Sequence, residues 1–485
     1  MKTIRPALAL LGLLALSAFA RADVSLPKIL GDGMVLQREL SVPIWGHAGA
    51  GDAVTVRFAG QEKQTKADAT GAWRVALDPL KASAEPRELT VTGANTITLK
   101  NVLVGEVWFC SGQSNMEYAV SIASSGAPAA APTDPALAEE IKTAHYATIR
   151  LFRVEKQLRP PEVVSNGWQE CTGEALGKFS AIGFFFGQDL QRALNIPVGV
   201  IQSSWGGARI APWTPKEAVS AEEFAKLIPS DQRGSGSLGT YYNGMVRPLV
   251  PFALRGVLWY QGESQIIAYN DGLRFADKLE TLITAWRSAW GRPDLPFYSV
   301  QIAPFLYSSR KDALPHASDE LPKLWEAQAL SLAIPHTGLV ATTDLVDDLK
   351  NIHPGHKREV GARLAALALT EIYGQSQPFA GPTYSKLEVA GGKAVVHFTH
   401  AAGLAARDGK PLSDFEVAGA DGQFVPADAV IRNDTVEISS PQVTAPVSVR
   451  FGWTESARPN LINHDGLPAY PFRTNCPTWT PASHP

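Results

Sequence analysis

The chain has 485 residues, more than one hydrophobic core accommodates, so about two or three domains are expected. Its 44 basic and 47 acidic residues leave a formal net charge of -3, which gives no electrostatic reason to expect nucleic acid or an anionic membrane as a partner. Hydrophobic residues make up 45% and charged residues 19%, values typical of a globular protein.

Residues 1–22 have the pattern of a secretory leader. Lys2 and Arg5 precede the apolar stretch 7–20, and Ala20-Arg21-Ala22 fits a small-x-small cleavage site. The apolar stretch is shorter than the roughly 20 residues that a membrane helix needs, and no later segment reaches that length. We therefore expect a periplasmic or secreted chain that begins near Asp23 and has no integral membrane partner. A retained N-terminal anchor is the alternative.

Residues 23–105 predict a β module. Short apolar or alternating runs are separated by turn-forming stretches at 49–52 and 68–71. These runs occur at 42–46, 53–58, 72–77, 88–92 and 96–99. A small β-sandwich is the most economical interpretation.

Strands and helices alternate over residues 106–375. Continuous apolar runs, typical of buried parallel strands, occur at 102–109, 198–201, 256–260, 297–302 and 339–342. Helical periodicity is present at 182–194, 273–290 and 357–373. The alternation predicts a doubly wound α/β domain.

Two stretches of this domain, 117–148 and 218–240, are rich in small residues and proline and predict insertions or lids. From 380 to 485 the pattern returns to short strands, which predicts a second β module. Its expected strands lie at 395–398, 430–438 and 447–452.

The chain contains three cysteines, so at least one thiol is free of any intrachain disulfide. Cys110 lies in an apolar run and is expected to be a buried small hydrophobe. Cys171 and Cys476 could pair in an oxidising compartment, but the sequence does not show that they are close. No Cys/His cluster has the spacing of zinc ligands.

Four polar segments follow predicted strands. Taken alone, each is as readily explained as a turn, a cap or a solvated loop. Because the carboxyl ends of parallel strands meet at one edge of a sheet, together they predict a nucleophile, a glycine donor, an amide donor and a base in one place. The segments are Gly112-Gln113-Ser114-Asn115-Met116, Ser203-Ser204-Trp205-Gly206-Gly207, Trp259-Tyr260-Gln261-Gly262-Glu263-Ser264 and the stretch from Asp344 to His353-Pro354.

These segments resemble the four blocks of the SGNH hydrolases, and specifically the sialate O-acetylesterase-like branch, which includes bacterial acetylesterases acting on polysaccharides such as xyloglucan. The resemblance covers most of the chain after the leader and includes the opening segment 31–38. It implies an SGNH-type three-layer α/β/α hydrolase domain with accessory all-β modules. It also implies acetyl-ester hydrolysis without a metal or other cofactor.

By this resemblance Ser114 is the nucleophile and His353 the general base. The Ser114 N–H, Gly206 or Gly207 and the Gln261 amide match the family's oxyanion donors. The acidic partner of the histidine is not fixed, because Lys350 and Asn351 stand where related enzymes carry Asp. Glu263 and Asp348 are equal candidates for that partner, and a Ser–His dyad is the third alternative.

The expected reaction is acyl transfer through an acetyl-enzyme, with an O-acetylated oligo- or polysaccharide, or O-acetylated sialic acid, as substrate. The sequence does not separate these sugars, and it leaves the oligomeric state open. A non-catalytic carbohydrate-binding protein with a relic hydrolase domain is the main alternative. A lipase or peptidase is disfavoured, because the chain lacks a Gly-x-Ser-x-Gly elbow. The expected substrate contacts are Asn115, Trp205, Arg209 and Trp213.

Overall fold

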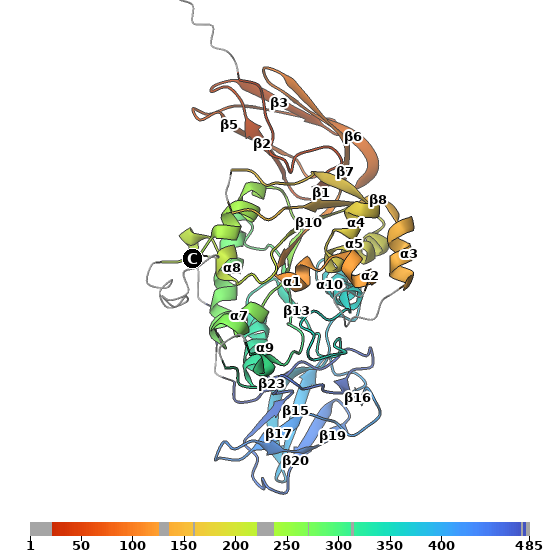
Figure 1. Ribbon diagram of the computed structural model, residues 1–485, viewed down its shortest axis with the longest axis vertical. Helices are drawn as coiled ribbons and strands as arrows, with labels where there is room; N and C mark the ends of the chain where they lie inside the picture. The colour runs from red at the N-terminus through yellow and green to blue at the C-terminus, as the bar shows by residue number, and fades with distance from the viewer. Residues whose placement is uncertain are drawn as a thin grey trace, which may run out of the picture.

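The structure is a computed structural model that describes residues 22–125, 135–158, 161–220, 237–269, 271–311, 315–476 and 479–481. The expected leader, up to residue 21, lies outside these residues, as do parts of the stretches 117–148 and 218–240 that were expected to be insertions. Figure 1 shows a central α/β region flanked by β structure at both ends of the long axis.

The central sheet is built around β7 (Thr96–Gly112). Its strand order is β13-β12-β11-β7-β10-β8-β9, and all neighbours are parallel except the edge strand β9. The chain moves from β7 to one side of the sheet and later returns to the other, so β7 marks a topological switch point. The other strands are β8 (His145–Arg153), β9 (Trp168–Thr172), β10 (Val198–Ser204), β11 (Gly256–Tyr260), β12 (Phe297–Val300) and β13 (Thr337–Val340).

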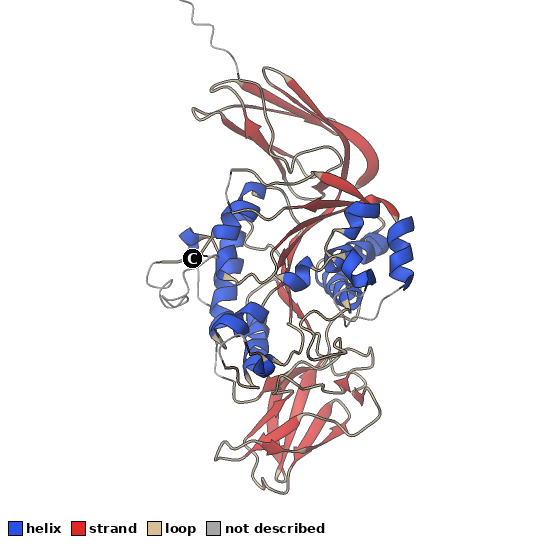
Figure 2. Ribbon diagram, viewed as in Figure 1, coloured by secondary structure: helices blue, strands red, loops and turns tan. Residues whose placement is uncertain are grey.

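Helices cover both faces of this sheet, as Figure 2 shows. On one side lie α5 (Ala181–Leu194) and α10 (Lys357–Glu371), and on the other α7 (Glu263–Tyr269), α8 (Arg274–Trp290) and α9 (Glu320–Leu330). The predicted three-layer α/β/α domain is therefore confirmed. None of the helices in the described ranges is long and apolar enough to cross a lipid bilayer.

Short helical segments complete this region. The short α-helices are α1 (Ser114–Glu117), α2 (Val120–Ser125), α3 (Pro135–Thr143) and α4 (Gly173–Gly177). The remaining single turns are η1 (Ala211–Trp213), η2 (Lys216–Ala218), η4 (Tyr242–Val246), η5 (Arg247–Leu249), η6 (Tyr307–Ser309) and η7 (Ser331–Ala333).

The N-terminal β module and the α/β domain share β7. The N-terminal half of this strand pairs with β6 and its C-terminal half with β10 and β11, so the expected boundary at residue 105 falls inside one continuous strand. At this junction the fully buried Glu106 accepts hydrogen bonds from Gln37, Arg38 and Arg255. The module's other strands are β1 (Val35–Gln37), β2 (Val42–His47), β3 (Ala53–Phe58), β4 (Gln61–Lys66), β5 (Ala72–Leu77) and β6 (Ser83–Thr92).

The C-terminal β module has a hydrophobic core of its own. The expected strand at 430–438 is in fact a hairpin, because Asn433 adopts φ +53° and turns the chain between β19 and β20. The strands are β14 (Thr383–Ala390), β15 (Lys393–Thr399), β16 (Ala405–Ala406), β17 (Phe415–Ala418), β18 (Val425–Pro426), β19 (Asp428–Arg432), β20 (Thr435–Ser439), β21 (Ser448–Phe451), β22 (Leu461–Ile462) and β23 (Phe472–Arg473).

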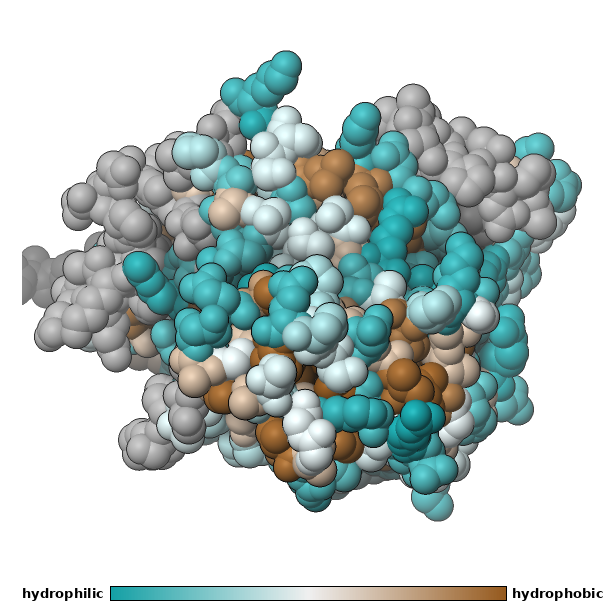
Figure 3. Space-filling view, turned by 90° about the horizontal axis from the view of Figure 1, so that it is seen from below, coloured by the Kyte–Doolittle hydropathy of each residue, from teal (hydrophilic) through white to brown (hydrophobic). Residues whose placement is uncertain are grey.

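Polar contacts join this module to the α/β domain. Arg473 makes two hydrogen bonds of 2.7 Å to the carboxylate of Glu326 in α9, and Tyr470 donates to the carbonyl oxygen of Leu339 in β13 at 2.7 Å. Seen from the end that carries this module, the surface mixes hydrophilic and hydrophobic residues (Figure 3). The side chains of Val430 and Val447 are among its exposed apolar groups.

The three cysteines are free thiols. Cys110 is fully buried in β7, as expected, and burial raises the pKa of its thiol. Cys171 is buried in β9 and Cys476 lies beside Glu326, so the structure does not contain a disulfide between them.

Candidate active site

Three of the four polar segments begin at the same level of the sheet. Gly112 at the end of β7 pairs with Ser204 of β10 on one side and with Tyr260 of β11 on the other. The segments that follow these residues therefore leave the sheet side by side, at its carboxyl edge and next to the switch point. This is the place where open α/β sheets bind their ligands.

The turn that carries Ser114 requires a glycine before it. Gly112 adopts φ +135°, and a Cβ atom on this residue would lie 2.1 Å from the carbonyl oxygen of Tyr260. The next N–H, of Gln113, donates to that same oxygen at 2.9 Å. The close approach of β7 and β11 thus fixes the point at which α1 begins with Ser114, whose side chain is partly exposed.

Ser114 and His353 form a hydrogen bond, with Oγ and Nε2 separated by 2.8 Å. His353 reaches this position from the loop between β13 and α10, 239 residues along the chain. Burial, together with the charge of Lys357, lowers the pKa of His353 to about 4. The imidazole is therefore neutral at physiological pH, the state in which Nε2 accepts the serine proton.

Neither acidic candidate partners the histidine. Asp348 is exposed, and its Oδ1 accepts the N–H of Lys350 in its own loop at 2.9 Å. Glu263 is buried and accepts a hydrogen bond from the side chain of Asn115 at 2.5 Å. Within the described part of the chain, no carboxylate is hydrogen-bonded to His353. Of the three alternatives left by the sequence, the structure therefore matches the Ser–His dyad.

Behind the dyad lies a buried polar network that the sequence did not reveal. Lys357 Nζ donates to Asn115 Oδ1 at 2.6 Å and to the carbonyl oxygen of Pro354 at 2.7 Å. Asn115 Nδ2 donates to Glu263 and, at 3.0 Å, to the carbonyl oxygen of Ile352. Asn115 is therefore buried and hydrogen-bonded within the protein through both its amide nitrogen and its oxygen, and its contact with substrate stays a prediction.

The two glycines expected to donate to an oxyanion have different surroundings. Gly206 lies beside the nucleophile, since a Cβ on Gly206 would be 3.6 Å from Ser114 Cβ, and its N–H donates to Glu117 Oε2 at 2.5 Å. Glu117 also pairs with Lys156 at 2.6 Å. Gly207 is exposed and has φ +73°, and a Cβ atom on this residue would have no atom within 4 Å.

Gln261 differs from its expected role. It is fully buried, and its Nε2 donates to Gln113 Oε1 at 3.2 Å and to the carbonyl oxygen of Ala208 at 3.3 Å. An amide nitrogen has two hydrogens, so both are already used. In this structure Gln261 links the turns after β7, β10 and β11, and its amide is not free to receive an oxyanion.

Comparison with known proteins now identifies the family. The family model for carbohydrate esterases described as sialic acid-specific acetylesterases matches residues 104–370, more than half of the chain. The chain belongs to this family. It is a carbohydrate O-acetylesterase, and the expected resemblance is confirmed.

Relatives match this chain over most of its length. Human sialate O-acetylesterase is 30% identical over 496 aligned residues that cover 91% of each chain, and the rat enzyme is 30% identical over 76% of this chain and 77% of its own. The crystal structure of a carbohydrate acetylesterase from Xanthomonas citri superposes with a TM-score of 0.82 at 35% identity. That superposition covers 94% of this chain and all of the other.

The aromatic residues of this acetylesterase after β10 divide into exposed and buried groups. Trp205 is partly exposed and stacks on Tyr241, with ring centroids 4.6 Å apart and planes inclined by 13°. Trp213 is fully buried, packed against Tyr241 and Trp259. The structure does not support the expectation that Trp213 flanks the substrate, because its ring is fully buried and packs against Tyr241. Arg209 is partly exposed, as a substrate contact requires.

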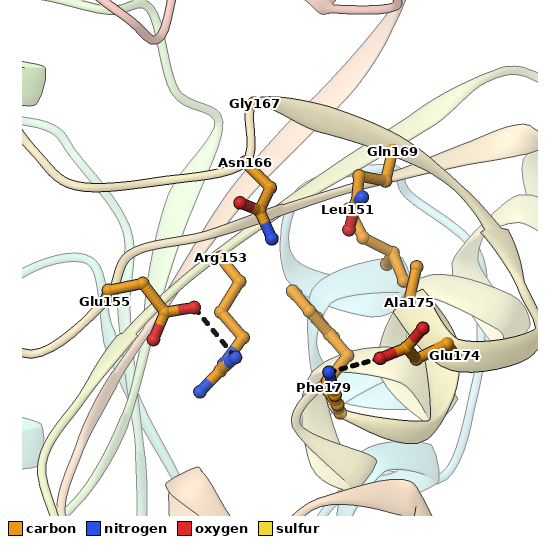
Figure 4. A pocket seen from close by; sticks show the side chains of 10 residues that line it. Leu151, Arg153, Glu155, Asn166, Gly167, Gln169, Glu174, Ala175 and Phe179 are labelled. Carbon is orange, nitrogen blue, oxygen red and sulfur yellow. Dashed lines mark hydrogen bonds and ion pairs between the residues drawn. The ribbon is translucent and has the colours of Figure 1, made fainter.

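A polar pocket with a volume of about 150 Å³ lies between β8, β9 and α4 (Figure 4). Arg153 and Glu155 line it and pair with each other at 2.9 Å. Glu174 and Lys178 form a second pair on its α4 side. Its charged groups thus already neutralise one another.

The described residues contain no group of three or more His, Cys, Asp or Glu side chains arranged to hold a metal ion.

Proposed function

We propose that Ser114 and His353 perform the deacetylation as a catalytic dyad, through a covalent acetyl-enzyme. The observation that carries this proposal is the 2.8 Å hydrogen bond between Ser114 Oγ and His353 Nε2 at the carboxyl edge of the sheet. A serine hydroxyl is a weak nucleophile unless a base accepts its proton, and a neutral imidazole within hydrogen-bond distance is such a base.

In the first half-reaction Ser114 Oγ attacks the acetyl carbonyl carbon while His353 Nε2 takes the hydroxyl proton. The tetrahedral intermediate collapses, and His353 gives this proton to the departing sugar oxygen. In the second half-reaction His353 takes a proton from water, which attacks the acetyl-enzyme. The second tetrahedral intermediate then collapses, releasing acetate and regenerating Ser114 as His353 returns the proton to Oγ.

The oxyanion is held by backbone donors in this proposal. Ser114 is the first residue of α1, and the first N–H groups of a helix have no partner inside it. The second donor comes from the Gly206–Gly207 turn. The N–H of Gly206 can donate to the oxyanion only after its hydrogen bond to the carboxylate of Glu117 breaks, whereas the N–H of Gly207 needs no such change. One such donor typically contributes about 3–4 kcal/mol of transition-state stabilisation.

Replacing the nucleophile tests the proposal directly. Ser114→Ala removes one partly exposed hydroxyl and leaves α1 and the core unchanged, so the variant should fold normally and lose nearly all release of acetate. His353→Gln should do the same. Turnover at the wild-type rate in correctly folded Ser114→Ala would remove the dyad from the mechanism. It would then require a different nucleophile for the release of acetate.

For the sugar itself we propose an O-acetylated oligo- or polysaccharide or an O-acetylated sialic acid. The name of the human enzyme supports the sialic acid, and that of the Xanthomonas enzyme supports an acetylated carbohydrate in general. The partly exposed Trp205 offers apolar ring surface to a sugar, and Arg209 offers a cation to a carboxylated one. Rates of acetate release from O-acetylated xyloglucan, xylan and sialic acid distinguish the classes. Arg209→Gln should impair only the carboxylated substrate.

We also propose that the chain is exported to the periplasm or secreted. The basic residues Lys2 and Arg5, the apolar stretch 7–20 and the Ala20-Arg21-Ala22 site support a cleaved leader. N-terminal sequencing of the protein recovered from its native compartment tests this, with Asp23 as the expected first residue.

A further inference from the structure

Hydrogen bonds tie the residues on both sides of His353 to the residue that follows the nucleophile. The carbonyl oxygen of Ile352, just before His353, accepts from Asn115 Nδ2 at 3.0 Å. The carbonyl oxygen of Pro354, just after it, accepts from Lys357 Nζ at 2.7 Å, and the same nitrogen donates to Asn115 Oδ1 at 2.6 Å. Since Asn115 is adjacent to Ser114, any relative movement of the two loops strains these bonds.

Lys357 occupies an unfavourable place for a cation. Its side chain is 1% exposed, and it is the first residue of α10, where the helix dipole repels positive charge. Burying an ammonium is costly unless it is paired and hydrogen-bonded. Here two oxygens accept its hydrogens, and the ring of Tyr118 lies 4.8 Å away. Apolar packing alone gives no reason for a lysine at this position.

Resting on the proposed function, we propose that Lys357 is a positioning residue of the dyad. It holds the turn that carries His353 against the Ser114 turn and thereby takes over the orienting task that a carboxylate performs in a Ser–His–Asp triad. It does so through the backbone on either side of the histidine, not through the imidazole ring. Lys357 touches no reacting atom, so its contribution is to alignment.

After burial, which is the larger cause, the positive charge of Lys357 also lowers the pKa of His353, the base of the proposed dyad. The other ionisable groups facing Lys357 are Glu263 from α7, Tyr260 from β11 and Tyr118 after α1. Burial raises the pKa of both phenols, which stay neutral below pH 10. On its own helix and loop lie Asp347 and Glu359, each of which pairs with His356.

The decisive variant is Lys357→Met, which keeps the length of the side chain but removes the charge and both hydrogen bonds. Loss of alignment should lower kcat by about 10- to 100-fold with little change in KM, because a misplacement of about 1 Å costs roughly that much. The acid limb of the kcat/KM profile should at the same time move to higher pH, since a positive charge near His353 has gone. A purely structural lysine predicts the shift of the acid limb without a loss of kcat in the folded enzyme, so the loss of kcat is the discriminating result.

Lys350→Met is the matched control. It makes the same substitution in the same loop, but Lys350 is exposed, so solvent screens its charge and the profile should stay that of wild type. Where Lys357→Met fails to fold, the double variant Lys357→Met/Glu263→Gln replaces both buried ionisable groups and should show the same two effects. Wild-type kcat in either folded Lys357 variant overturns the proposal, whether or not the acid limb moves. If Ser114→Ala loses activity but the Lys357 variants keep it, the proposed dyad is supported and only the positioning role of Lys357 is wrong.

Discussion

The pH dependence of the wild-type enzyme follows from the surroundings of His353. Its imidazole must be neutral to accept the proton of Ser114, so kcat/KM falls as the pH drops through the pKa of the base in the free enzyme. That pKa is lowered from 6.5 to about 4 by burial and by Lys357. Because the lowered pKa belongs to a base, the active form persists into acid and is lost only below about pH 4.5.

The lowered pKa of His353 changes the expected kcat/KM in mild acid by an amount that is simple to measure. At pH 5.5 a base with a pKa of about 4 is ~97% neutral, whereas one with the ordinary pKa of 6.5 is ~9% neutral. The expected kcat/KM at pH 5.5 is therefore close to its value at pH 7.5, and an unperturbed histidine predicts roughly a tenfold loss.

The assay is acetate release from a neutral acetylated sugar, stopped at timed points and quantified at one common pH. Tryptophan fluorescence at each pH, and recovery of activity after return to pH 7.5, show that the chain stays folded. A half-maximal kcat/KM near pH 6.5 in folded enzyme would refute the reasoning that burial and a neighbouring cation keep this histidine neutral.

Two further outcomes are expected. Asp348→Asn should keep wild-type kcat in the acetate assay, because the exposed carboxylate only caps the N–H of Lys350; a loss approaching the ~10⁴-fold typical of a missing triad acid would restore Asp348 to the mechanism. Glu106→Gln should lower the free energy of unfolding by about 3–5 kcal/mol in urea titrations, because Arg38 and Arg255 lose their shared buried partner. An unchanged urea midpoint would show that these arginines find other partners.

The sequence predicted the parts of the fold that local pattern determines. The apolar run at Gly256–Tyr260 is a strand with those limits, and Ser114 and His353 were predicted from their places after apolar strands. The strand expected at 339–342 lies at Thr337–Val340, because pairing with β12 places Val340 opposite Val300. Register of this kind depends on the neighbouring strand, and the strand's own residues do not encode it.

The extent of β7 could not be predicted for a similar reason. The polar pair Lys100 and Asn101 interrupts the apolar pattern, and Asn101 even adopts φ +57°. The strand continues because β6 pairs with its first half and β1 with the residues just after the interruption. Tertiary pairing thus overrides a local break, and the two expected domains share one strand.

The buried network was invisible in the sequence, because Lys357 and Asn115 are 242 residues apart. One signal was present: a lysine as the first residue of a helix, where the dipole disfavours a cation. Such a residue is usually a solvated side chain, but here Lys357 is buried beside Asn115 and the rings of Tyr118 and Tyr260. A misplaced charge in a sequence is therefore informative once the fold is known.

In the proposed dyad, the lack of a carboxylate partner for His353 among the described residues has a physical consequence for the chemistry. A carboxylate on the far nitrogen of an imidazole orients the ring and also raises its pKa, so orientation and basicity change together. In this site Asn351 Oδ1 accepts a hydrogen bond from the backbone N–H of His353 at 3.0 Å. Asn115 and Lys357 donate to the backbone carbonyl oxygens of the residues on either side of His353. Orientation then comes from the backbone, while burial and a cation set the pKa. An esterase built in this way gains activity in acid and forgoes the stabilisation that a carboxylate gives to the imidazolium.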